Sequence, residues 1–203
     1  MPAEHAPTSV MLRSGSRVLI RPIRPEDKEA LIDGLHRLTP ESRYRRFFSL
    51  MPELSARQLR YLTEVDHRTH EALVATDPST GDGIGVARFI RSRTDSRVAE
   101  VAVAVVDDWQ GRGVGTALLE ALAARGREEG VERFTASVLA LNRRMLDLLR
   151  RLGDTTVVDR AADVVDLQIE LRDTGIPAGL SQTMRAAARG EIAIEPLHPA
   201  APS

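Results

Sequence analysis

The 203-residue chain contains no cysteine. This absence excludes disulfide bonds, thiolate metal sites, iron–sulfur clusters and a cysteine nucleophile. The sequence also lacks an apolar run close to the roughly 18 residues that cross a membrane. Its first residues, MPAEHAPTSVMLRSGSR, do not show the order of charge and apolar core that marks a signal peptide. We therefore expect a soluble, cytoplasmic protein that does not associate with a membrane.

The chain carries almost no net charge, since 28 lysines and arginines face 29 aspartates and glutamates. This balance removes the global basic excess of many nucleic-acid-binding proteins, and we predict no nucleic-acid partner. Lys28 is the only lysine, so the chain has almost no target for acetylation of its own lysines. Apolar residues make up 42% and charged residues 28%, as in ordinary globular proteins.

The length fits one domain with a tail. Residues 1–16 are rich in proline, serine, glycine and alanine without periodicity, and we expect them to form a flexible arm. We place the domain at residues 17–172. Residues 173–203 are rich in proline, alanine and glycine and are expected to form a tail, with one short helix at 180–189.

Apolar periodicity along the domain predicts both strands and helices. The expected strands are 18–24, 71–76, 84–91, 97–106, 133–139, 155–158 and 164–171. The expected helices are 25–38, 39–48, 55–62, 116–129 and 142–152. Strands come early and strand–helix units come late, which predicts one α/β (α+β) domain with a mixed sheet covered by helices.

A strand that is apolar on both faces, Val101–Val106, leads into the sequence Gln110-Gly-Arg-Gly-Val-Gly-Thr116, which opens a helix. Unbonded N–H groups at a helix start and the positive end of the helix dipole favour phosphate oxygens. Glycine lets the backbone approach an anion closely and adopt positive φ. Arg112 adds a positive charge. The turn therefore predicts an anion-binding site.

Three kinds of ligand use such turns, and the sequence separates them. A nucleoside triphosphate loop requires a lysine, which is absent here. A dinucleotide fold requires a third glycine where Thr116 stands, and it uses the first strand–helix unit rather than one in mid-chain. The pyrophosphate of coenzyme A is the remaining class. A tight strand-to-helix turn without a ligand is the structural alternative.

Gln110, Gly113 and Gly115 match the pattern Q/R-x-x-G-x-G/A of the GNAT superfamily of N-acetyltransferases. Leu141-Asn142 at a helix start and Leu152-Gly153 at its end also match. On these residues the chain resembles that family from about Arg17 to Leu171. The resemblance implies a GNAT fold, whose mixed, mostly antiparallel sheet splays between the fourth and fifth strands. The pantetheine arm of the coenzyme lies in that gap.

Acetyl-CoA is the co-substrate that the resemblance implies, and no metal is expected. His67 and His70 lie beside Asp66, but too few ligands surround them to suggest a metal site. Asn142 would reach the coenzyme or simply cap its helix. The implied coenzyme-binding residues are Val103, Ala104, Val105, Gln110, Gly111, Arg112, Gly113, Val114, Gly115, Thr116 and Asn142.

Acetyl transfer to an amine needs a general base near that amine. Glu100 is the only charged residue between Val98 and Val106, and in the family a carboxylate on this strand often serves as the base. We expect partial burial to raise its pKa towards neutrality. The alternative is a solvated charge near a strand end. The family suggests a backbone N–H near Val105 as the oxyanion donor.

Two positions depart from the family pattern. Many members have a tyrosine as general acid where this chain has Leu149, so the thiolate would leave unaided or by way of water. The phenylalanine that follows L-G in the family is replaced by Asp154. These departures indicate a subfamily rather than a different fold.

The segment Ser42–Phe48 resembles the S-x-Y-x-R-F-F segment of Pat-type bacterial protein lysine acetyltransferases, which lies near their acceptor site. The alternative is a helix that packs its aromatic residues into the core. We predict direct transfer of acetyl from acetyl-CoA to a primary amine, either a protein lysine or a small-molecule amine. A non-catalytic, acyl-CoA-binding regulatory domain is the rival hypothesis. Monomer and homodimer remain open.

Overall fold

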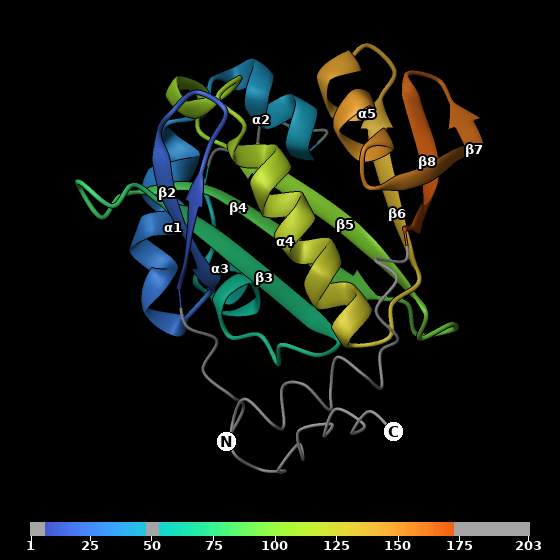
Figure 1. Cartoon of the computed structure of the whole chain (residues 1–203), viewed down its shortest axis with the longest axis horizontal. Coiled ribbons are helices and arrows are strands. Elements are labelled where there is room, and N and C mark those ends of the chain that lie inside the picture. The colour runs from blue at the N-terminus through green and yellow to red at the C-terminus, as the bar shows by residue number, and fades with distance from the viewer. Residues whose placement is uncertain (1–6, 48–52, 173–203) are drawn as a thin grey trace, which may run out of the picture. The chain divides into compact units, whose positions relative to one another are not determined.

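The computed structural model describes residues 7–47 and 53–172. They form an eight-stranded sheet in the order β1-β2-β3-β4-β5-β6-β8-β7 (Figure 1). Every neighbouring pair is antiparallel except β5–β6, which is parallel. The predicted mixed, mostly antiparallel sheet is thereby confirmed. No helix among the described residues is long and apolar enough to cross a membrane.

The strands agree with the predicted ones except for β1, which was not expected. They are β1 (Thr8–Met11), β2 (Arg17–Pro22), β3 (His70–Thr76), β4 (Gly83–Arg91), β5 (Val98–Val105), β6 (Arg133–Leu139), β7 (Gly153–Ala161) and β8 (Val164–Leu171). The helices are α1 (Lys28–His36), α2 (Pro40–Phe47), α3 (Ala56–Thr63), α4 (Val114–Glu128) and α5 (Arg143–Arg150). Two 3₁₀ turns are η1 (Pro25–Asp27) and η2 (Asp107–Trp109).

The prediction of a flexible arm over residues 1–16 is wrong for the segment that forms β1. This strand pairs antiparallel with β2, in a register that places Val10 opposite Val18. Val10 packs against the core, and Leu12 is buried. Backbone pairing at a sheet edge stabilises a short strand whose sequence has no periodicity of its own. The helix expected at 180–189 lies outside the described residues.

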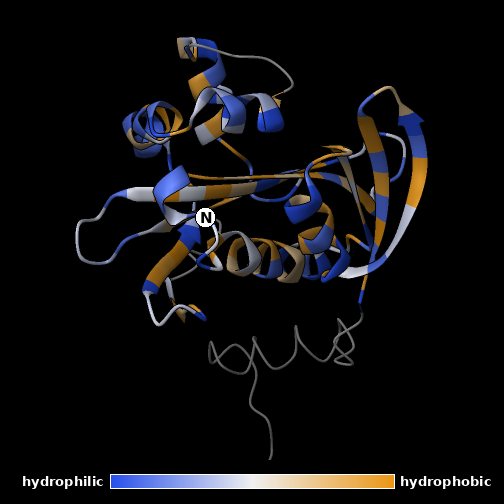
Figure 2. Ribbon diagram, turned by 90° about the horizontal axis from the view of Figure 1, so that it is seen from above, coloured by the Kyte–Doolittle hydropathy of each residue, from blue (hydrophilic) through white to orange (hydrophobic). Residues whose placement is uncertain are grey.

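Helices cover both faces of the sheet, with α4 on one face and α1, α2 and α3 on the other (Figures 1 and 2). α4 packs on β3, β4 and β5. Its apolar stripe of Val114, Leu118 and Leu122 repeats every four residues and is buried against Val101 and Val103 of β5. The sheet therefore lies at the centre of the domain, and α4 fixes the position of β5.

The predicted splay of the sheet is present between β5 and β6. Their parallel ladder covers only Val98–Glu100 opposite Arg133–Thr135. β5 nevertheless continues to Val105 on its β4 side, and β6 continues to Leu139 on its β8 side. Beyond Glu100 the two strands diverge, so the facing backbone edges are left without a strand between them.

A buried ion cluster joins α4 to β3. The carboxylate of Glu71, only 1% exposed, accepts hydrogen bonds from Arg125 Nε at 3.2 Å and from His67 Nδ1 at 2.7 Å. Burial would lower the pKa of Arg125, but its hydrogen bond to Glu128 and the charge of Glu71 outweigh burial and raise that pKa. The cluster holds the helix against the sheet behind the splayed region.

We expect Arg125→Met to lower the free energy of unfolding by about 3 kcal/mol, because it leaves the buried Glu71 carboxylate without its guanidinium partner. Urea denaturation followed by circular dichroism measures the loss. Arg127→Met on the same helix is the matched control and should change stability by no more than about 0.5 kcal/mol. A loss for Arg125→Met no larger than that of the control would contradict the role assigned to the ion pair.

Candidate active site

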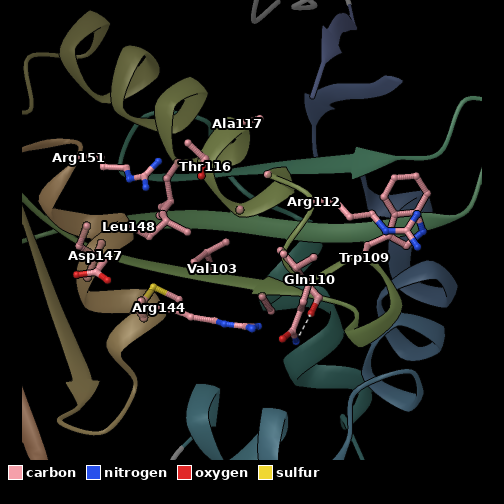
Figure 3. Close-up of a pocket in the computed structure, with 18 of the residues that line it drawn as sticks. Val103, Trp109, Gln110, Arg112, Thr116, Ala117, Arg144, Asp147, Leu148 and Arg151 are labelled. Atoms are coloured by element: carbon pink, nitrogen blue, oxygen red, sulfur yellow. Dashed lines mark hydrogen bonds between the residues drawn. The ribbon is translucent and has the colours of Figure 1, made fainter. Parts of the chain in front are cut away.

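The gap between β5 and β6 opens into a pocket of about 930 Å³ (Figure 3). Its walls come from β5 and β6, from the glycine turn with the first turn of α4, and from α5. Residues of β1, the β1–β2 connection and α2 complete the rim. The volume lies within the range of ligand-binding clefts.

The structure brings nearly all of the predicted site residues together in this pocket. Those that line it are Glu100, Val103, Ala104, Val105, Gln110, Gly111, Arg112, Gly113, Gly115, Thr116 and Asn142. The exception is Val114, whose side chain is 1% exposed and packs into the core. Val114 therefore does not line the pocket.

The glycine turn has the backbone geometry that anion binding needs. Gly111 and Gly113 have φ of 78° and 101°, in the left-handed region that favours glycine. Gly113 is the N-cap of α4, whose first N–H groups have no acceptor within the helix. A Cβ at Gly115 would lie 3.3 Å from Leu148 of α5, so glycine permits close packing there. The turn thus offers backbone donors and the positive end of a helix.

Arg112 is held at the rim by an aromatic contact. Its guanidinium lies 4.8 Å from the centre of the Trp109 ring, and Figure 3 shows the two side chains stacked. The cation–π contact restrains the exposed guanidinium beside the turn. Trp109 was not among the residues predicted for the site, although the single tryptophan of the chain stands directly before the glycine turn.

Gln110 fastens the glycine turn to the end of β5. Its Nε2 donates to the carbonyl of Val105 at 3.1 Å and to Asp107 Oδ1 at 2.7 Å, and it lies 3.2 Å from Ser42 Oγ. Burial would raise the pKa of Asp107, but hydrogen bonds from Ser42 and Thr39 outweigh it and hold that pKa below its usual value. The amide nitrogen of Gln110 is therefore used for positioning the turn.

Asn142 caps α5 and also lines the pocket. Its Oδ1 accepts from the Met145 N–H at 3.2 Å, so the capping alternative raised from the sequence is confirmed. Its amide nitrogen has no hydrogen-bond partner among the described residues and is available to a ligand. Leu149, on the same helix, is 1% exposed and forms part of the wall. An apolar side chain therefore stands where a tyrosine acid would be expected.

Glu100 lies at the point where the sheet divides. It is paired with Ile90 on β4 and is the last β5 residue paired with β6, opposite Thr135. Its side chain is exposed, so the expected partial burial is wrong. Burial lowers the pKa of the Arg46 guanidinium on α2, while attraction to Glu100 opposes that shift. A carboxylate and a cation from α2 thus face each other at one end of the pocket.

Positive charge surrounds the pocket. The arginines that line it are Arg13, Arg45, Arg46, Arg112, Arg144 and Arg151, against the three carboxylates Glu100, Glu120 and Asp147. Figure 3 shows Arg112, Arg144 and Arg151 on different sides of the cleft. Such a field attracts an anionic ligand. Sequence reasoning missed Arg13, Arg144 and Arg151, because they come from separate elements.

The second face of the sheet carries another charged contact. Arg88 of β4 is 6% exposed, and its Nη1 donates to the carbonyl of Leu62 at 3.3 Å and to His70 Nε2 at 3.1 Å. Burial, and then the charge of Arg88, lower the pKa of His70 to about 4. Because Nε2 accepts a hydrogen bond, His70 is neutral with its proton on Nδ1.

A family model described as an acetyltransferase (GNAT) domain matches residues 17–155. The acetyltransferase Pat of Mycolicibacterium smegmatis is 37% identical over 171 residues, which cover 84% of this chain and 49% of that protein. An acetyltransferase of Pseudomonas aeruginosa is 33% identical over 144 residues, 70% of this chain and 77% of that one. The chain therefore belongs to the GNAT acetyltransferase family.

Solved structures lead to the same family. The crystal structure of the GNAT domain of S. lividans Pat superposes with a TM-score of 0.76 at 36% identity. The match covers 84% of this chain and 99% of that domain. The chain spans about half the length of the Pat protein of M. smegmatis. Within the described residues, no three acidic or histidine side chains gather as they would around a metal ion.

His70 makes stability depend on pH. Its folded pKa of about 4 is below the value of about 6.5 in an unfolded chain. Between these values the unfolded state binds more protons, so the free energy of unfolding falls as the pH falls through this window. We expect His70→Gln, which keeps an acceptor for Arg88, to reduce the loss of stability between about pH 7 and about pH 5.

Urea denaturation at the two pH values checks this expectation. His36→Gln, at the end of α1, is the control for the removal of a histidine. An undiminished pH dependence in His70→Gln would show that another group is responsible.

Proposed function

We propose that the chain transfers an acetyl group from acetyl-CoA to a primary amine, and that a protein lysine is the acceptor. The observation that carries this proposal is the open edge of β5 between Glu100 and the glycine turn. The segment from Glu100 to Val105 extends over roughly 17 Å at about 3.4 Å per residue. A pantetheine arm can lie along this edge as an added strand, with the pyrophosphate at the turn.

Each part of the pocket has a role in this binding mode. The backbone of Val103, Ala104 and Val105 would hydrogen-bond the pantetheine arm in place of the missing β6 partner. The N–H groups from Gly111 to Thr116 would hold the pyrophosphate, with Arg112 beside them. The amide nitrogen of Asn142 would contact the coenzyme from α5. The arginine-rich rim supports binding of a ligand with several phosphates.

The chemistry follows from the same geometry. The amine nitrogen attacks the thioester carbonyl, and the Glu100 carboxylate accepts the amine proton directly or through a water. A backbone N–H near Val105 would stabilise the oxyanion of the tetrahedral intermediate. The C–S bond then breaks and the thiolate of the coenzyme leaves. Because Leu149 occupies the position of the usual acid, the thiolate would take its proton from water.

The choice of a protein lysine is supported by the likeness to Pat and by α2. Within α2, residues 42–47 match most of the Pat-type segment, while Phe48 lies outside the described residues. α2 contacts β5 and places Arg46 beside Glu100, where an acceptor would enter. The alternative of a small-molecule amine shares this entry. The regulatory alternative is favoured by Leu149 but leaves the placement of Glu100 unexplained.

We expect Glu100→Gln to lower kcat/KM for acetyl transfer by about 10²- to 10⁴-fold, because the amine loses its base. The Kd for acetyl-CoA should stay within about twofold, since the carboxylate does not contact the coenzyme. Thiol release with a panel of lysine peptides, acyl-CoA-forming ligases and small amines measures the first quantity. Calorimetry measures the second.

Glu170→Gln on β8 is the control, because Glu170 is a strand glutamate that does not line the pocket. Unchanged turnover in Glu100→Gln would reject Glu100 as the base. Tight binding of acetyl-CoA without thiol release from any acceptor would instead support the regulatory alternative.

A further inference from the structure

A second, smaller cavity of about 150 Å³ lies between α1, α2 and the sheet. Aliphatic side chains such as Leu31, Leu35 and Val86 form much of its wall. Leu38, Arg46 and Ala104 line both this cavity and the large pocket, so the two adjoin near the reacting end of the cleft. An engineered apolar cavity of this size accommodates a benzene molecule. The cavity therefore has room for a chain of a few carbon atoms.

Two arginines make this apolar cavity unusual. Arg46 and Arg88 both line it. Arg88 forms no ion pair with a carboxylate among the described residues, whereas Arg46 lies over the Phe47 ring at 5.0 Å and is attracted to Glu100 from beyond ion-pair distance. Arg21, which also lines it, is already paired with Asp27. Burial of a cation without a counter-charge is costly. This cost is seen at Arg88. Burial, and then the charge of the neighbouring Arg46, lower the pKa of Arg88 to about 10.

Only one of the three guanidinium nitrogens of Arg88 forms hydrogen bonds with the described residues. Nη1 donates to Leu62 at the end of α3 and to His70, which explains its position. The other two guanidinium nitrogens make no hydrogen bond to the described residues. A guanidinium presents a planar fork of donors that matches a carboxylate. Arg88 is thus 94% buried, at 6% exposure, with donors left over beside an apolar space.

We propose that this cavity binds the carboxylate of a short aliphatic chain between Arg46 and Arg88. The chain carbons would contact Leu31, Leu35 and Val86, and the carboxylate would supply the counter-charge that Arg88 lacks. The role of this cavity in acyl transfer rests on the proposed function. The carboxylate belongs either to the far end of a short dicarboxylic acyl group on the thioester or to the amine acceptor.

The acyl-transfer step is the same whichever molecule carries the carboxylate. The amine nitrogen bonds to the acyl carbon, the C–S bond breaks, and the amine proton passes to Glu100. The carboxylate in the cavity takes no part in bond making. It fixes the position of the acyl chain or of the acceptor, which supplies selectivity through a charge-assisted contact.

Binding of a carboxylate is measured without any acyl donor, by methyl NMR on the full chain. Sodium butyrate is titrated, with butyramide as the neutral probe of the same shape. We expect butyrate to shift the methyl signals of Leu31 and Val86 saturably. Butyramide should bind at least about tenfold more weakly, the equivalent of one hydrogen bond to a charged group. Leu148, which lines only the large pocket, reports on binding elsewhere.

Three variants test the site itself. Arg88→Met and Arg46→Met should each weaken butyrate binding by about tenfold or more. Because Arg88 also supports α3, Gly34→Leu provides a variant that keeps both cations and fills the cavity from α1. Gly34 lines the cavity and a Cβ there meets nothing within 4 Å. Leucine also favours a helix over glycine, so folding should be retained while binding is lost.

Arg43→Met is the matched control on α2, because Arg43 lines neither cavity and donates to the carbonyl of Leu35. It should bind butyrate as the unaltered chain does. Absence of saturable shifts at Leu31 and Val86 would overturn the proposal, as would equal binding of butyramide. Retained binding in a folded Gly34→Leu would overturn it too.

Two kinetic comparisons then assign the source of the carboxylate. If it comes from the donor, succinyl-CoA should exceed butyryl-CoA in kcat/KM by about tenfold, and Arg88→Met should remove this preference. If it comes from the acceptor, kcat/KM should be higher for glutamate than for glutamine as the accepting amine, and Arg88→Met should remove this preference. Absence of all acyl transfer would refute the proposed function, but saturable butyrate binding would still support the carboxylate site. The two failures are therefore distinguishable.

Discussion

The divergence of β5 from β6 after Glu100 is the constraint on which the site depends. Each strand keeps its order because it is paired on its other side, with seven residue pairs joining β5 to β4 and seven joining β6 to β8. Backbone groups that face the gap still need partners, since an unsatisfied buried N–H or carbonyl is costly. An open seam in a sheet that is held firmly on both sides therefore suits a ligand with an extended chain.

The open end of the seam is fixed by polar contacts that cross between elements. Asp107 accepts from the Thr39 N–H and from Ser42 Oγ on α2, and from Gln110 at the start of the glycine turn. Arg37 reaches from the end of α1 to Asp108 at 2.8 Å. These contacts connect α2 and the end of α1 to the glycine turn. A shift of α2 would thus disturb both halves of the site together.

Local patterns in the sequence predicted most of the fold and most of the residues that line the large pocket along β5 and the glycine turn. The glycine turn was predictable because positive φ and helix-start amides depend on a few adjacent residues. β1 was missed because its order comes from pairing with β2. The expected burial of Glu100 was wrong, and Arg13, Arg144 and Arg151 were missed, for a related reason. Their surroundings are set by elements distant in the sequence.

The alternation of side chains along β5 explains how one strand serves both cavities. Val101 and Val103 are buried in the same core cluster as the apolar side of α4, while the alternate residues Ala102 and Ala104 lie on the other face of the strand, where Ala104 lines the small cavity. A larger side chain at Ala104 would take up part of the small cavity. Arg46 enters this space from α2, close to Glu100 and Arg88. The small side chain of Ala104 therefore lets the small cavity adjoin the large pocket beside Arg46, which lines both.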